Sequence, residues 1–127
     1  MPQFPMSESR RPILERIPDY SIDISPSQHH ITVRSGNIIL AESDDALLLE
    51  ETQHEDVFYL PMPDVNLSIL TPTDLSTYCP FKGHASYWSL NEMQINFVWG
   101  YPDPYPEVDA IRSYFSFYSD KVIIEAR

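Results

Sequence analysis

The feature that most constrains the fold is a succession of short apolar segments, each ended by a proline, a glycine or a polar turn. The chain of 127 residues contains twelve prolines and three glycines. Proline removes a backbone donor and disfavours helix at the residue before it, which leaves little room for long helices. The pattern predicts a mainly β protein: a single compact, barrel-like domain of about eight short antiparallel strands with one or two short helices.

Residues 1–27 differ from the rest, because they hold five prolines interspersed with serine and arginine. We expect a proline-rich N-terminal arm over residues 1–27 and the β domain over residues 28–127. Hydrophobic residues make up 43% of the chain and aromatic residues 13%. That amount of apolar material suffices for one packed core and not for two.

The clearest hairpin signal joins residues 31–34 to residues 38–40 through Ser35-Gly36-Asn37. Further strands are predicted at residues 56–60, 75–79, 84–90, 93–101, 111–118 and 121–125. Residues 111–118 and 121–125 are expected to pair with each other around Ser119-Asp120. Short helical segments are expected at residues 63–70 and 107–110.

Two segments need a closer interpretation. Residues 46–51 fit either a helix capped by Ser43 or a buried strand, because six residues are too few for periodicity to decide. In residues 93–101, strand alternation would send successive side chains to opposite faces. The apolar face would carry Ile95, Phe97 and Trp99, and the other face Gln94, Asn96 and Val98.

Charge excludes several classes of partner. The chain has 8 basic and 19 acidic residues and a formal net charge of −11. It lacks the cations that bind nucleic-acid phosphates or an anionic membrane surface. No apolar run approaches the ~20 residues that span a bilayer, and residues 1–11 lack the apolar core of a signal peptide. We expect a cytoplasmic protein without nucleic-acid or membrane partners, in which exposed sheet edges permit a homodimer.

One cation stands apart, because Lys82 is the only basic residue among thirteen acids between Arg34 and Arg112. It lies three residues after the single cysteine, Cys79, and directly before Gly83. An ammonium beside a thiol favours the nucleophilic thiolate, so Cys79 is a candidate nucleophile. Lys82 itself is a candidate ligand-binding charge, and a purely structural pair with a glutamate is the alternative.

No metal or other cofactor is expected. A single cysteine cannot form a multi-cysteine zinc site, and the four histidines lack the spacing of metal ligands. Three isolated glycines cannot build a phosphate-binding loop. Tyrosine and tryptophan, by contrast, are abundant in the second half of the chain, and their polar tips suit the wall of a small-molecule pocket.

The order of these motifs resembles a known family. Cys79-Pro80-Phe81-Lys82-Gly83-His84-Ala85-Ser86-Tyr87, followed by Trp99, Tyr101, Pro102 and Glu107, is similar to the signature of the bacterial and fungal family called domain of unknown function 427. The resemblance covers residues 29–126 and implies a β-tent fold like that of methionine-R-sulfoxide reductases. Zinc-bearing relatives of that fold use paired Cys-x-x-Cys motifs, which this chain lacks. The recurrent family positions correspond here to Glu50, Tyr59, Asp64, Cys79, Lys82, Tyr87, Trp99 and Tyr101.

The leading hypothesis is a small-molecule-binding domain whose aromatic pocket holds an anionic or carbonyl-bearing ligand. Lys82 would anchor the ligand with Cys79 beside it, and Glu50 or Asp64 would orient the lysine or act as acid or base. Tyr59, Tyr87, Trp99 and Tyr101 would form the walls. One alternative is a small-metabolite enzyme that uses Cys79 or Lys82 as nucleophile. Another is an acidic protein-interaction module.

Overall fold

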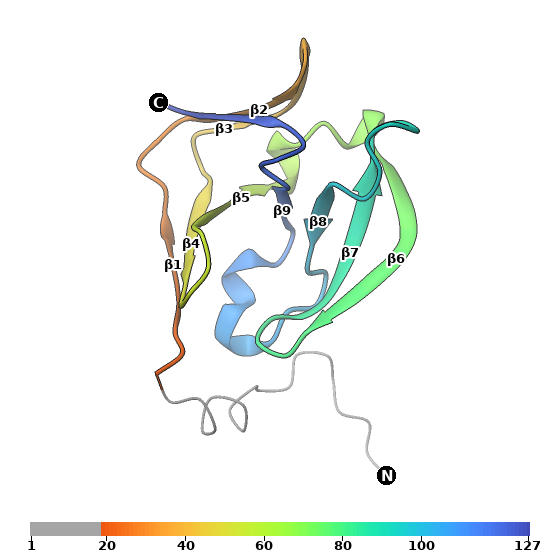
Figure 1. The fold of residues 1–127 in the computed structure, drawn as a ribbon. Helices are drawn as coiled ribbons and strands as arrows, with labels where there is room; N and C mark the ends of the chain where they lie inside the picture. Colours follow the sequence, from red (N-terminus) through yellow and green to blue (C-terminus); the bar gives the residue numbers. More distant parts are fainter. Residues whose placement is uncertain (1–18) are drawn as a thin grey trace.

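A computed structural model describes residues 19–127, which form ten β-strands and three short 3-10 helices (Figure 1). The sheets are antiparallel throughout these residues, so the predicted mainly β class is confirmed, with ten strands where the sequence predicts about eight. The first 18 residues of the predicted N-terminal arm lie outside the described residues.

Seven of the strands in residues 19–127 form one sheet, in the order β1-β4-β5-β9-β8-β7-β6. They are β1 (Ile22–Pro26), β4 (Leu47–Glu51), β5 (Val57–Pro61), β9 (Tyr114–Phe117), β8 (Val98–Gly100), β7 (Gly83–Ser89) and β6 (Thr71–Cys79). Figure 1 shows β1 and β4 on one side, β7 and β6 on the other, and β5, β9 and β8 between them. The sheet therefore curves, and its two ends form facing walls.

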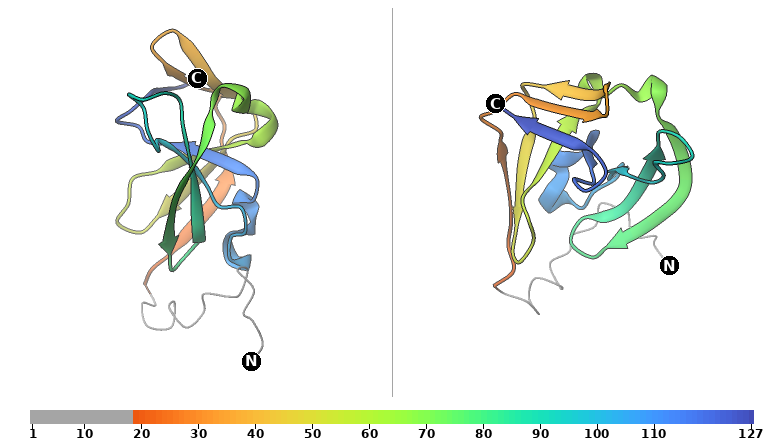
Figure 2. Two further views of the ribbon diagram at one scale, coloured as in Figure 1. Left: turned by 90° about the vertical axis from the view of Figure 1, so that its right-hand side faces the viewer. Right: turned by 45° about the horizontal axis from the view of Figure 1, so that its top comes forward.

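Three strands, β10 (Ile123–Ala126), β2 (Ile31–Ser35) and β3 (Ile38–Ser43), form a smaller sheet that lies across one end of the first (Figures 1 and 2). The predicted hairpin is confirmed as β2 and β3, with Gly36 at a φ of +58° in the turn. Left-handed backbone of this kind favours glycine, which has no Cβ.

The predicted pairing of the last two strands is wrong. Strand β9 pairs with β5 and β8, whereas β10 pairs with β2 in the smaller sheet. Phe115 and Phe117 of β9 are buried, and Ile124 of β10 pairs with Val33. The turn at Ser119-Asp120 carries the chain from one sheet to the other, and local turn chemistry does not specify which strands its ends join.

Strand β1 lies inside the range 1–27 that the sequence assigns to the arm. Ile22 and Ile24 are half-buried, whereas Asp23 and Ser25 are exposed on the other face. This alternation is typical of a strand with one buried face. The described structure therefore places the start of the β domain at residue 22 and not at residue 28, and the part of the proposed arm from residue 22 onward belongs to the sheet.

The ambiguous residues 46–51 form strand β4, and Ala46 and Leu49 are buried. The helical segments expected at residues 63–70 and 107–110 are 3-10 helices. They are η1 (Met62–Asp64), η2 (Leu67–Ile69) and η3 (Pro106–Ile111).

The alternation predicted for residues 93–101 is also wrong, because only Val98–Gly100 forms a strand. Asn91 accepts hydrogen bonds from the following backbone N–H groups and closes a turn. Asn96 then takes a φ of +54°, which breaks the two-residue period. As a result Phe97 and Val98 are both buried, while Ile95 is 59% exposed.

Buried side chains form two clusters. The first lies between the smaller sheet and the larger one and includes Leu40, Leu60, Phe97, Val98 and Phe115. The second lies within the curve of the larger sheet. It comprises Leu49, Tyr59, Ala85, Tyr87, Tyr101, Val108 and Ile111. Three of its members are tyrosines, so the second cluster brings polar groups into an apolar setting.

Candidate functional site

A cavity of about 640 Å³ lies against the second cluster, between the facing walls of the larger sheet. It lies within the size range of small-molecule pockets, roughly 300–1,000 Å³. Six predicted site residues line it: Tyr59, Cys79, Lys82, Tyr87, Trp99 and Tyr101. They come from β5, the end of β6, the β6–β7 turn, β7, β8 and the residue after β8.

The β6–β7 turn directs Lys82 into the protein. The backbone N–H of Lys82 donates to the carbonyl of Cys79 at 3.1 Å, and its own carbonyl accepts from the N–H of Tyr105 at 3.0 Å. Gly83 follows with a φ of +118°, and a Cβ there would lie 3.3 Å from the carbonyl oxygen of Asp103. The turn is therefore fixed from both sides, and Lys82 is only 8% exposed.

Lys82 is paired with Glu51, the last residue of β4. Its Nζ lies 2.6 Å from Oε1 of Glu51, and the two side chains are 10% and 7% exposed. The other carboxylate oxygen, Oε2, accepts a hydrogen bond from the hydroxyl of Tyr20, and Nε2 of His54 lies 3.9 Å from it. Nζ of Lys82 also lies 3.8 Å from Sγ of Cys79. An ammonium, a carboxylate and a thiol thus meet at the cavity wall.

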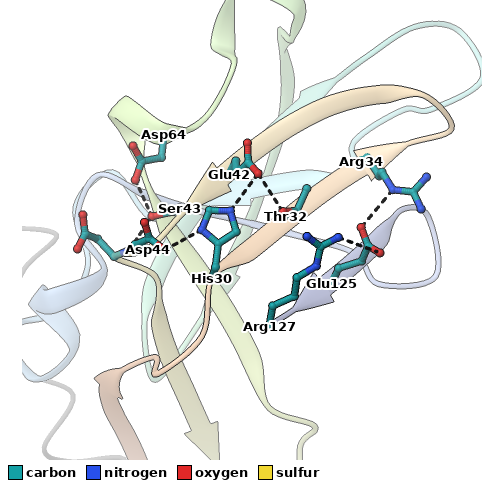
Figure 3. Close-up of polar contacts among 10 residues, drawn as sticks. His30, Thr32, Arg34, Glu42, Ser43, Asp44, Asp64, Glu125 and Arg127 are labelled. Atoms are coloured by element: carbon teal, nitrogen blue, oxygen red, sulfur yellow. Dashed lines mark hydrogen bonds and ion pairs between the residues drawn. The ribbon is translucent and has the colours of Figure 1, made fainter.

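The carboxylates expected to orient Lys82 are not the ones that do so. Glu50 is exposed, because neighbouring residues of a strand point to opposite faces. Asp64 lies in η1 and accepts a hydrogen bond from the hydroxyl of Ser43, which is drawn in Figure 3. Glu51 shares a face with buried Leu49, two residues earlier, and that two-residue period is the sequence signal for Glu51.

The aromatic wall is held by its own hydrogen bonds. Nε1 of Trp99 donates to the hydroxyl oxygen of Tyr59 at 3.2 Å, and the two rings meet edge to face. The hydroxyl of Tyr87 lies 2.8 Å from Oγ1 of Thr77. Burial raises the pKa of Tyr59 and of Tyr101 above the usual value. These phenols therefore stay neutral at physiological pH and can donate hydrogen bonds.

Sequence reasoning missed further lining residues. Tyr20 stacks on Phe81, with ring centroids 4.0 Å apart and planes 10° from parallel. The ring of Tyr118 packs against that of Trp99, with ring centroids 4.6 Å apart. Tyr20 is 31 residues from Glu51 along the chain, so no local pattern joins them. Tyr118 lies in a segment whose strand partner the sequence does not reveal.

The ionisable groups around the cavity carry net negative charge. Lys82 is accompanied by Glu51, Glu55 and Asp56, and His54 lies beside them. Among residues 19–127, no group of three or more histidine, cysteine or acidic side chains is arranged to hold a metal ion.

A separate polar cluster lies on the smaller sheet (Figure 3). His30 lies between Glu42 and Asp44, with Nε2 2.9 Å from Oε2 of Glu42 and Nδ1 2.7 Å from Oδ1 of Asp44. Hydrogen bonds to Glu42 and Asp44 raise the pKa of His30, and the bond to His30 lowers the pKa of Glu42. Glu42 and Asp44 are exposed, and His30 is partly exposed. This cluster therefore connects surface strands and lines no part of the cavity described above.

Residues 23–127 match the family described as domain of unknown function (DUF427), and the chain belongs to that family. The family predicted from the Cys79–Tyr87 motif and Trp99 is thereby confirmed. The match begins within β1, in agreement with the start of the sheet. Among proteins of curated function, none matches the chain. Within residues 19–127, no helix is long and apolar enough to cross a membrane.

Proposed function

We propose that this DUF427 protein binds a small, carbonyl-bearing molecule in the aromatic cavity, with the ammonium of Lys82 donating to the carbonyl oxygen. The supporting observation is the Lys82–Glu51 pair, buried in the wall of a cavity of about 640 Å³. Burying two charges removes them from water, which costs free energy that an exposed pair keeps. A buried ion pair is therefore weak evidence that its role is to stabilise the fold. Its position beside an open cavity fits a role in binding.

The charges around Lys82 favour a neutral ligand over an anion. Glu51 neutralises the ammonium at 2.6 Å, and Glu55 and Asp56 add negative charge to the lining. An anion would be repelled by these carboxylates, whereas a neutral carbonyl accepts a hydrogen bond without that penalty. Of the two ligand classes that the sequence suggests, the carbonyl-bearing class therefore fits better. We place this activity in the cytoplasm, as the sequence predicts.

The tyrosine and tryptophan side chains suit the same ligand class. Tyr87, Trp99 and Tyr101 give the cavity flat apolar surfaces with polar tips. Planar carbonyl compounds bury their faces well against such rings, and aromatic contacts add about 0.5–1.5 kcal/mol each beyond area burial.

A thiol enzyme is the second candidate, because Sγ of Cys79 lies at the cavity wall 3.8 Å from the ammonium. Lys82 is a less suitable nucleophile, because its Nζ is already engaged by the carboxylate of Glu51 at 2.6 Å. Iodoacetamide labelling tests the thiol. Faster modification of the native protein than of the urea-unfolded chain would support a nucleophilic Cys79, and slower modification would argue against it.

A thermal-shift screen tests the binding proposal. The full chain is screened against a metabolite set in which each aldehyde, ketone or amide has a matched alcohol or amine. A ligand raises Tm by mass action, so we expect carbonyl compounds to shift Tm more than their partners.

The matched variants decide the role of Lys82. Lys82→Met combined with Glu51→Gln removes the ammonium without leaving a buried charge unpaired. We expect this double variant to lose the Tm shift, and Lys121→Met, at the exposed second lysine, to retain it. An equal shift in the double variant would remove Lys82 from the site.

A further inference from the structure

Tyr20 occupies a defined position at the edge of the cavity. Its ring lies parallel to that of Phe81 at 4.0 Å, and its hydroxyl donates to Oε2 of Glu51. Phe81 directly precedes Lys82 in the β6–β7 turn. The ring of Tyr20 therefore adjoins the Lys82–Glu51 pair, and Tyr20 is itself one of the residues that line the cavity.

Glu51 needs the donor that Tyr20 supplies. Its side chain is 7% exposed, and Lys82 bonds to one carboxylate oxygen while Tyr20 bonds to the other. A buried carboxylate oxygen without a donor is costly, because water no longer solvates it. Nε2 of His54, at 3.9 Å, is beyond hydrogen-bond distance of Oε2, so a group that takes the place of the Tyr20 ring must bring its own O–H or N–H donor.

The backbone allows Tyr20 to leave without disturbing the sheet. Ser21 is held to Thr52 by two hydrogen bonds, from its N–H to Oγ1 at 2.8 Å and from the N–H of Thr52 to its carbonyl at 3.0 Å. Ile22 then pairs with Glu51 in the β1–β4 ladder. Tyr20 is the residue immediately before this anchored stretch, so its ring can swing away while β1 stays paired.

We propose that Tyr20 is a displaceable internal occupant of a ring-binding subsite between Phe81 and Glu51. The subsite accepts a planar aromatic ring with an O–H or N–H donor at its edge. This proposal rests on the function proposed above, and it narrows the ligand class to an aromatic hydroxyl or amine compound that also carries a carbonyl. The ring stacks on Phe81, the donor bonds to Glu51, and the carbonyl reaches Lys82 next to it.

The test uses p-cresol, which reproduces the side chain of tyrosine, with toluene as the matched probe that lacks the hydroxyl. Binding to the full chain is measured by calorimetry or by ligand-observed NMR for the wild type and for Tyr20→Ala. We expect p-cresol to bind Tyr20→Ala about tenfold more tightly than the wild type, because the internal competitor is gone. We expect toluene to bind Tyr20→Ala about tenfold more weakly than p-cresol does, because it leaves Glu51 without a donor.

Two further variants keep the result unambiguous. Tyr78→Ala removes an exposed tyrosine that contacts His84 and Tyr105, and it should bind p-cresol as the wild type does. Tyr20→Phe keeps the ring but removes its hydrogen bond to Glu51. Its ring should compete less well, so its affinity for p-cresol should lie between those of the wild type and Tyr20→Ala.

Several outcomes would overturn the subsite. These are equal p-cresol affinity in Tyr20→Ala and the wild type, equal affinity of p-cresol and toluene, or a Tyr20→Phe variant that behaves as the wild type. Because p-cresol has no carbonyl, its binding does not depend on carbonyl recognition by Lys82. Failure of the metabolite screen would thus leave the p-cresol result standing, and failure of p-cresol would leave the screen standing.

Discussion

Lys82 with Glu51, and His30 with Glu42 and Asp44, bring opposite charges together in two different settings. Their contact distances are similar, 2.6 Å in the first cluster and 2.9 and 2.7 Å in the second. Their burial is not: the side chains are 10% and 7% exposed in the first, and 34%, 55% and 81% in the second. Water and salt screen the second cluster and largely spare the first. Distance alone therefore does not tell which pair matters for stability or for binding.

The largest difference in stability between the two clusters should appear when one charged side chain of a pair is removed. Lys82→Met leaves the buried carboxylate of Glu51 without its cation, and we expect a loss of about 3–5 kcal/mol in the free energy of unfolding. Urea denaturation at neutral pH measures it. Adding Glu51→Gln should restore part of this loss. A single variant as stable as the wild type, or a double variant less stable than the single one, would contradict the comparison.

The second largest difference in stability should come from replacing the glycines in the turn that carries Lys82 and in the turn between β2 and β3. Gly83 has a φ of +118°, and a Cβ there would lie 3.3 Å from the carbonyl oxygen of Asp103. Gly36 has a φ of +58°, and a Cβ there would meet no atom within 4 Å. We expect Gly83→Ala to cost about 2–3 kcal/mol and Gly36→Ala about 1 kcal/mol. Chemical denaturation of both variants compares them directly. Equal losses would mean that the turn carrying Lys82 is no more constrained than the surface hairpin.

The smallest effect should come from the surface cluster and should depend on pH. The carboxylates raise the pKa of His30 above 6.5, so the folded state binds the proton more tightly than the unfolded state. The resulting stability is fully present below 6.5 and is lost as pH rises through the raised value. His30→Gln should therefore be less stable than the wild type at acidic pH, down to where Glu42 protonates, and equal to it at alkaline pH.

Thermal melts over a pH series measure this difference, and the same series in high salt should reduce it because the cluster is exposed. A difference that grows with rising pH would have the wrong sign. A difference that high salt leaves unchanged would show that the cluster is shielded in the way that Lys82 and Glu51 are.

Local patterns in the sequence predicted those parts of the molecule that local interactions determine. The hairpin at Gly36 follows from the backbone freedom of glycine, and the structure has it. The pairing of β10 with β2 could not be predicted from local sequence. Pairing between distant segments depends on which strand edges remain open after the rest of the chain has folded. The β-tent name that the family resemblance implies stays a prediction.

In the cavity, too, the contacts between residues close in sequence were predictable and those between distant segments were not. Lys82 and Cys79 are neighbours in sequence, so their proximity at the turn was predictable. Glu51 was one residue from a predicted position, and the alternation that starts at buried Leu49 would have identified it. Tyr20 had no such signal, because its contact with Glu51 joins segments that only the β1–β4 ladder brings together.

The Lys82–Glu51 contact also has a mechanical consequence for the larger sheet. Glu51 lies on the second strand from one end of that sheet, and Lys82 lies in the turn between the last two strands at the other end. The contact therefore connects the two ends of an open sheet. Amide hydrogens of β4 and β7 should then exchange in one cooperative opening, and a ligand that bridges Lys82 and Glu51 should slow the exchange of both strands together.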